Sequence, residues 1–337
     1  MRLKPVPVEP QGVVSRTLSF EDNGRCAVLF GRHHEHLALV EQHLPVSLAA
    51  RGNLVTISGE EQPVDAAASV LEGLYRQLEV EPDLSRDEVD AAVRMVLLEP
   101  QGAAALTADD VVIRTERRRV SPRSPTQAAY LRALRAHDLV FGIGPAGTGK
   151  TYLAVATGVA LLKQRAVDRL ILSRPAVEAG ERLGFLPGDM KDKVDPYLRP
   201  LYDALQDMLP EGKLGAMLES GQIEIAPLAF MRGRTLANAF VILDEGQNTT
   251  PAQMKMFLTR LGENSRMVVT GDPSQHDLPP GTRSGLVDAV RRLDQTSEVA
   301  VIRFTERDIV RHPLVEVVLK AYGGDSAVPS EAEPDHG

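Results

Sequence analysis

The chain has 337 residues, of which 43% are hydrophobic and 25% charged, a composition typical of a globular protein with room for two domains. Its formal net charge is -8, so a polyanionic partner would have to meet a local basic patch and not the field of the whole molecule. A single cysteine, Cys26, excludes an intramolecular disulfide and a cysteine-based zinc site and favours a reducing cytoplasm. The N-terminus lacks the apolar core of a signal peptide, and the longest apolar stretch, 153–162, is too short to span a bilayer, so we expect a cytoplasmic protein without a membrane partner.

The first part of the chain, residues 1–113, predicts a small α+β domain. Residues 1 to about 15 indicate a mobile or edge segment, and the apolar run 27–30 predicts a strand. Apolar spacing then predicts a helix over 35–44, a β-hairpin over 46–50 and 54–57, and a helix over 64–78. This βαββα order resembles an RNA-binding module of the KH type, whose GXXG loop clamps the nucleic-acid backbone. Here the segment after the predicted strand is GRHH, with Gly31 alone, so RNA binding and a structural or docking role both stay open.

Two polar clusters follow in the N-terminal half. His33, His34 and His36 could suggest a metal site, but no cysteine-type ligand lies nearby, so a solvated helix start is favoured. After a predicted helix over 88–98, residues 114–125 form a basic tract that we place between two domains. It is either a solvated linker or a contact for RNA phosphates. Its arginines are Arg114, Arg117, Arg118, Arg119 and Arg123.

A phosphate-binding loop stands at the centre of the second domain, predicted over residues 126–322. The run GPAGTGKT matches G-x-x-x-x-G-K-[ST] and lies between an apolar strand and a helix that begins at Lys150. Backbone N–H groups of this loop would hold phosphate, Lys150 would reach the β- and γ-phosphates, and Thr151 would ligate Mg²⁺. The predicted nucleotide-binding residues are Gly144, Pro145, Ala146, Gly147, Thr148, Gly149, Lys150 and Thr151. Upstream, Gln127 is placed to read the adenine edge, as in helicase-like ATPases, or else faces solvent on a helix.

Carboxylates end a second buried strand, in VILDEGQ. We predict that Asp244 holds Mg²⁺ opposite Thr151 and that Glu245 orients and deprotonates the attacking water. A third strand, 267–270, ends in GDPSQ, where Gln275 or Asp272 could sense the γ-phosphate. Further strands at 169–173, 223–225 and 299–304, a helical insertion at 190–209 and a last helix at 308–322 complete an α/β, RecA-like P-loop NTPase sheet. The tail, 323–337, is disordered by composition.

These motifs together resemble the PhoH family, single-motor relatives of superfamily 1 helicases. The runs AGERLGFLPGD, FMRGRT, NTTPAQMKMFLTRLG, VVTGDPSQHDLP and DIVRHPLV are also similar to that family, so the resemblance covers most of the chain. It implies ATP and Mg²⁺ as cofactors, a role in RNA metabolism and a YbeY-type endoribonuclease as partner. One departure is Gly246, which makes the family's DEAQ into DEGQ and removes a methyl but no functional group.

The resemblance also raises the question of a missing arginine. A superfamily 1 helicase takes arginines for the γ-phosphate from a second motor lobe, and the chain after Gly271 is too short for one. An arginine finger contributes about 10³-fold or more to turnover. We therefore expect a homo-oligomer, a hexamer by analogy with the family, in which a neighbour supplies Arg311, or alternatively Arg307 or Arg303.

Two other functions stay open. A P-loop kinase would transfer phosphate to an acceptor, whereas Asp244, Glu245 and Gln247 favour water as the acceptor. An ATP-gated module could instead recruit an endoribonuclease with little unwinding of its own, and its turnover would not respond to RNA.

Overall fold

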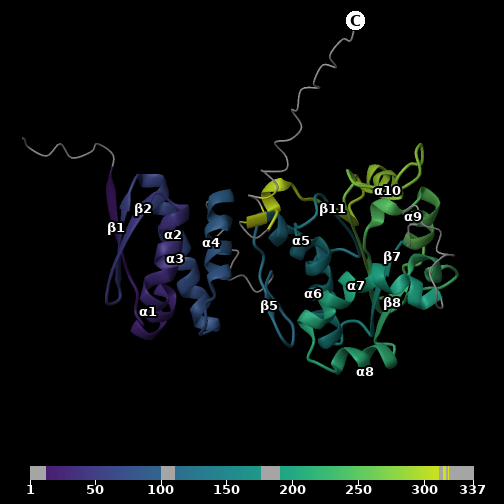
Figure 1. The fold of residues 1–337 in the computed structure, drawn as a ribbon, viewed down its shortest axis with the longest axis horizontal. Coiled ribbons are helices and arrows are strands. Elements are labelled where there is room, and N and C mark those ends of the chain that lie inside the picture. The colour runs from purple at the N-terminus through teal and green to yellow at the C-terminus, as the bar shows by residue number, and fades with distance from the viewer. Residues whose placement is uncertain (1–12, 100–110, 176–189, 311–313, 316–317, 319–337) are drawn as a thin grey trace, which may run out of the picture.

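The computed structural model describes residues 13–99, 111–175, 190–310, 314–315 and 318, apart from the side chains of residue 80 and of 190–197. It has two domains side by side, one built on an antiparallel sheet and one on a parallel sheet (Figure 1).

The N-terminal domain packs helices against a three-stranded antiparallel sheet in the order β1-β3-β2. In the central strand, Val55 and Ile57 are fully buried and belong to the same core as Leu29, Val40 and Leu71 of the helices. Its elements are β1 (Val14–Ser19), α1 (Asn23–Phe30), η1 (Arg32–His34), α2 (Glu35–His43), β2 (Val46–Arg51), β3 (Leu54–Gly59), α3 (Glu61–Val80) and α4 (Arg86–Leu98).

The predicted strand at 27–30 is wrong, because these residues form the second half of α1. The Asp22 carboxylate accepts hydrogen bonds from the N–H groups of Gly24 at 2.7 Å and Arg25 at 3.0 Å, so the helix starts at Asn23, four residues before the predicted strand. The first strand is β1, at an edge of the sheet, so GRHH joins two helices instead of following a strand. The predicted hairpin and the helices at 35–44, 64–78 and 88–98 are confirmed.

The basic tract is ordered and bonded to both domains. It contains a hairpin of β4 (Ile113–Arg114) and β5 (Arg119–Val120). Arg119 pairs with Glu81 at 3.1 Å in the N-terminal domain, and Arg118 pairs with Asp207 at 2.8 Å in the second domain. These arginines therefore connect the two domains.

The second domain has six parallel strands in the order β11-β6-β10-β9-β7-β8, which confirms the predicted P-loop NTPase sheet. Strand β9 is wholly apolar and buried because both faces of the sheet are covered there. In β9, Phe240 and Ile242 join the core under α6, whereas Val241 and Leu243 pack with Phe257 of α9 and other residues on the opposite face. Its elements are α5 (Pro125–Ala136), β6 (Leu139–Ile143), α6 (Lys150–Lys163), β7 (Arg169–Arg174), α7 (Met190–Met208), α8 (Lys213–Glu219), β8 (Ile223–Pro227), η4 (Leu228–Met231), β9 (Ala239–Leu243), η5 (Gly246–Asn248), α9 (Pro251–Leu258), β10 (Arg266–Gly271), α10 (Gly285–Leu293), β11 (Val299–Arg303) and η6 (Glu306–Asp308).

The C-terminal predictions lie largely outside the described residues. This holds for most of the predicted helix at 308–322, including Arg311, and for the tail 323–337. Among the helices that the structure describes, none combines the length and the apolar character that crossing a bilayer requires.

Candidate functional site

The candidate site lies at the carboxyl ends of neighbouring parallel strands. The phosphate loop follows β6, Arg174 ends β7, Asp244 and Glu245 follow β9, and Asp272 follows β10. This is the edge of an open α/β sheet at which ligands bind.

The phosphate loop has the backbone that its glycines allow. Gly147 and Gly149 have φ of 80° and 81°, in the left-handed region. Gly144 has φ of 140°, and a Cβ there would lie 2.4 Å from the carbonyl oxygen of Phe304. Helix α6 begins at Lys150, as predicted, so its N-terminal N–H groups and the positive end of its dipole face the loop.

The Lys150 ammonium lies inside the loop. Its Nζ donates to the carbonyl oxygens of Gly144 and Pro145, both at 2.7 Å, and to the Thr148 hydroxyl at 3.2 Å. Burial lowers the pKa of Lys150 below its usual value, an effect that the charge of Asp272 and other carboxylates opposes only in part. The ammonium therefore lacks a full counter-charge, which an anionic phosphate would supply.

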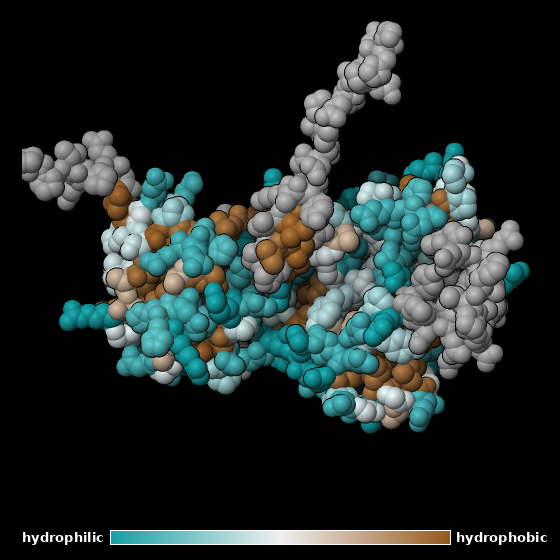
Figure 2. All heavy atoms as spheres, viewed as in Figure 1, coloured by the Kyte–Doolittle hydropathy of each residue, from teal (hydrophilic) through white to brown (hydrophobic). Residues whose placement is uncertain are grey.

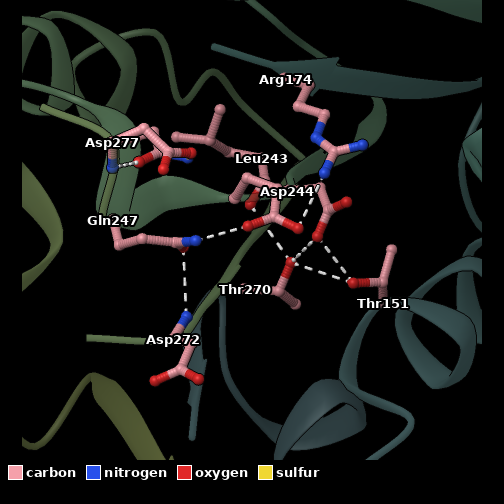
Figure 3. A network of polar contacts seen from close by, with 10 residues as sticks. Thr151, Arg174, Leu243, Asp244, Gln247, Thr270, Asp272 and Asp277 are labelled. Atoms are coloured by element: carbon pink, nitrogen blue, oxygen red, sulfur yellow. Dashed lines mark hydrogen bonds and ion pairs between the residues drawn. The ribbon is translucent and has the colours of Figure 1, made fainter. Parts of the chain in front are cut away.

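Asp244 is the centre of an oxygen-rich cluster beside the loop (Figure 3). Its Oδ1 accepts hydrogen bonds from the hydroxyls of Thr151 at 2.6 Å and Thr270 at 2.7 Å. Mg²⁺ prefers such hard oxygen donors and is commonly held by one or two carboxylates together with substrate phosphates. The residues present therefore fit Mg²⁺ between Thr151 and Asp244.

Glu245 adopts a backbone conformation that non-glycine residues rarely take, with φ of 54° and ψ of 39°. Its Oε1 accepts a hydrogen bond from Nη2 of Arg174 at 2.7 Å, and its Oε2 accepts one from the Gln247 amide. The side-chain Oε1 of Gln247 in turn accepts a hydrogen bond from the backbone N–H of Asp272 at 3.1 Å (Figure 3). Strands β7, β9 and β10 thus jointly fix the position of this carboxylate.

The GDPSQ turn brings Asp272, not Gln275, into the site. The Asp272 side chain is 8% exposed, and its Oδ1 accepts from Ser274 while its Oδ2 is buried without a partner among the described residues. Gln275 is exposed and contacts Asp272 through its backbone N–H.

Gln127 lies under the phosphate loop on α5 and is not solvated. Its Nε2 donates to the Thr148 carbonyl at 3.0 Å, and its Oε1 accepts from the Arg123 N–H at 2.7 Å. Each end of the amide is thereby used once, which leaves one N–H and one lone pair for a ligand.

Gly246 packs closely against β10. A Cβ at this position would lie 2.7 Å from Cγ1 of Val269, so the methyl of the DEAQ sequence does not fit here without a shift of β10 or of that side chain.

The histidine cluster forms no metal centre in the structure. His36 is buried, with its Nδ1 3.0 Å from the Val28 carbonyl at the end of α1. Within the part of the chain that the structure describes, no three His, Cys, Asp or Glu side chains are grouped to hold a metal ion.

Comparison with known proteins agrees with these motifs. The family model for PhoH-like proteins matches residues 119–323. The chain belongs to the PhoH-like family. A PhoH-like protein of Bacillus subtilis is 47% identical over 87% of this chain and 92% of its own length. A PhoH-like protein of Synechocystis is 44% identical over 91% of this chain and 94% of its own length. The PhoH protein of Escherichia coli K12 is 49% identical over 59% of this chain and 57% of its own length. The family and the loop together make this a nucleotide-binding P-loop ATPase.

Two residues of the site were missed as functional candidates. Arg174 directly follows the strand predicted at 169–173, and Thr270 is the last residue of the strand predicted at 267–270. A polar residue at the end of an apolar parallel strand is the signal that both share with Asp244, and it could have identified them.

Proposed function

We propose that this PhoH-like ATPase hydrolyses ATP with Mg²⁺ and couples hydrolysis to the binding or remodelling of RNA. The observation that carries the proposal is the fixed carboxylate of Glu245 beside the Thr151–Asp244 pair and the phosphate loop. Mg²⁺ would neutralise charge on the β- and γ-phosphates there, while Lys150 binds the same phosphates.

Water fits the site better than a phosphate acceptor does. Glu245 lies next to the metal ligand Asp244 and is held by Arg174 and Gln247, which is the arrangement that a base for an attacking water requires. Asp272, with a buried oxygen that has no partner among the described residues, can accept a hydrogen bond from a water beside the γ-phosphate. A kinase would instead yield a phosphorylated acceptor.

The turn between α1 and α2 supports RNA binding by the N-terminal domain. Gly31 has φ of 74°, and a Cβ there would lie 2.8 Å from the side chains of Glu35 and His36, so only glycine fits. His34 takes the place of the second glycine of a GXXG loop and has a left-handed φ of 63°. Arg32, His33 and His34 are exposed, so this turn can present cationic and N–H groups to a phosphate backbone.

Two partners complete the proposal. One is a YbeY-type endoribonuclease, by family resemblance. The other is a neighbouring subunit of a homo-oligomer, a hexamer by analogy with the family, that supplies an arginine to the γ-phosphate. Arg311, the first candidate, lies outside the described residues; Arg303 is bonded to Asp294 at 2.7 Å, and Arg307 is exposed.

Hydrolysis is tested by the substitution Glu245→Gln, which keeps the size of the side chain but removes the base. We expect steady-state release of free phosphate to fall about 10²-fold or more while ATP still binds. Glu263→Gln, at an exposed glutamate outside the site, is the matched control and should retain wild-type turnover. Wild-type turnover in Glu245→Gln, or phosphate that appears on an acceptor and not in solution, would refute the assignment.

A further inference from the structure

A cavity of about 750 Å³ lies between the two domains and reaches the phosphate loop. Gly147, Gly149, Tyr152 and Leu153 line it from the loop and the first turn of α6. From the N-terminal domain it is lined by residues of α4 and its N-cap, the helix that faces the second domain in Figure 1: Ser85, Asp87, Glu88 and Ala91. Its volume is within the range of pockets that hold small ligands.

The cavity lies where the rest of a bound nucleotide must go. A nucleotide whose phosphates occupy the loop must place its ribose and base in a space that adjoins the loop. Three other cavities, near Ser265, Lys163 and Ser284, touch no residue of the loop.

The lining suits a purine nucleoside. Tyr152, Leu153 and Val310 offer apolar surface, and the guanidinium group of Arg123 can stack on a ring. The Gln127 amide, which also lines the cavity, keeps one N–H and one lone pair, the pair of groups that matches the N6/N7 edge of adenine.

The wall formed by α4 is bonded both to the basic tract between the domains and to the second domain. Glu88 of α4 pairs with Arg119 at 3.2 Å, and Asp87 pairs with Arg123 at 3.2 Å. Arg94 of α4 donates to the Ile309 carbonyl at 3.3 Å, and the next residue, Val310, donates its N–H to the carbonyl of Gly147 in the loop at 3.0 Å. One connection from the N-terminal domain to the phosphate loop therefore runs through the two adjacent residues Ile309 and Val310.

We infer that α4 of the N-terminal domain forms one wall of the pocket for the base and ribose of ATP, so that a bound nucleotide bridges the two domains. The inference rests on the proposed function in that it takes ATP as the nucleotide. It assigns to α4 a part in nucleotide affinity, although α4 contributes no residue to the phosphate loop or to the carboxylate pair.

The test is Asp87→Trp in the full chain, compared with Arg86→Trp in the same helical turn. Asp87 lines the cavity and Arg86 does not, both are exposed, and the chain has no tryptophan of its own, so each variant carries a single fluorophore. Binding of ATP is measured beside binding of inorganic tripolyphosphate, which can occupy the phosphate loop but has no base.

For Asp87→Trp we expect ATP to bind about tenfold more weakly, or to quench the tryptophan emission, while tripolyphosphate binds as it does to wild type and leaves the emission unchanged. Arg86→Trp should alter neither ligand's binding. Asp87→Ala, which breaks the pair with Arg123 without filling the cavity, should weaken ATP less than Asp87→Trp does.

The inference is overturned if Asp87→Trp binds ATP with wild-type affinity and unchanged emission, or if both ligands are weakened equally. A wild-type protein that binds no ATP would refute the proposed function itself, which is a separate outcome.

Discussion

At the scale of the residue, Lys150 has a charge state that should change with nucleotide binding. Burial lowers its pKa below the usual 10.5, so it loses its proton at a lower pH than a solvated lysine does. Bound phosphates favour the ammonium and raise that pKa again. ATP binding should therefore take up protons at alkaline pH below 10.5, and ATP affinity should fall as pH rises through the pKa of the free protein.

Proton uptake is measurable by titration calorimetry in two buffers of different ionisation enthalpy. Lys255→Met, at an exposed lysine on α9, should keep the uptake, because this residue lies outside the phosphate site. Binding enthalpies of the wild-type protein that do not depend on the buffer throughout this pH range would contradict the assignment.

At the scale of the element, the start of α5 depends on Ser124. Its hydroxyl accepts the N–H of Gln127 at 3.2 Å and donates to the buried carboxylate of Asp308 at 2.7 Å. Ser124→Ala removes the helix cap and leaves an acceptor of Asp308 unpaired, so it should lower the free energy of unfolding by about 2 kcal/mol. Urea denaturation measures the loss.

Ser220→Ala supplies the control for that comparison. Ser220 is exposed, and its hydroxyl donates only to the Met217 carbonyl at 3.2 Å, so its removal should change the unfolding free energy by less than about 0.5 kcal/mol. Equal denaturation midpoints for the two variants would show that the Ser124–Asp308 contact is not stabilising.

Sequence patterns predicted the elements of the second domain well, because each of these elements has a signature within a short stretch of sequence. A buried parallel strand such as β9 is a continuous apolar run, and the phosphate loop needs glycines at fixed spacing. The strand predicted at 27–30 is wrong because four consecutive apolar residues do not distinguish a strand from a helix. The signals for a helix lie outside this run: Asp22 caps its start, and Cys26 is buried on the same face as Leu29 and Phe30.

The site was only partly predictable, because some of its contacts join strands that are distant in sequence. Glu245 could be recognised from its motif, whereas its bond to Arg174 depends on β7 and β9 being neighbours in the sheet. Likewise, the basic tract could be read as a linker or an RNA contact, since nothing in the sequence shows that Arg119 reaches Glu81 and Glu88.

At the scale of the whole molecule, the two domains share bonds close to the nucleotide site. Arg94 and Val310 connect α4 to the phosphate loop, and the turn proposed to bind RNA belongs to the same N-terminal domain as α4. A ligand that changes how this domain docks would thus change the loop, which is a route for RNA to alter turnover.

The most direct test of the central claim is steady-state ATP hydrolysis by the full chain with and without single-stranded RNA. The account predicts that RNA raises phosphate release several-fold in the wild-type protein and that Glu245→Gln shows neither the basal nor the stimulated rate. Turnover that does not respond to RNA across a saturating range would contradict coupling and leave an ATPase whose energy is used elsewhere.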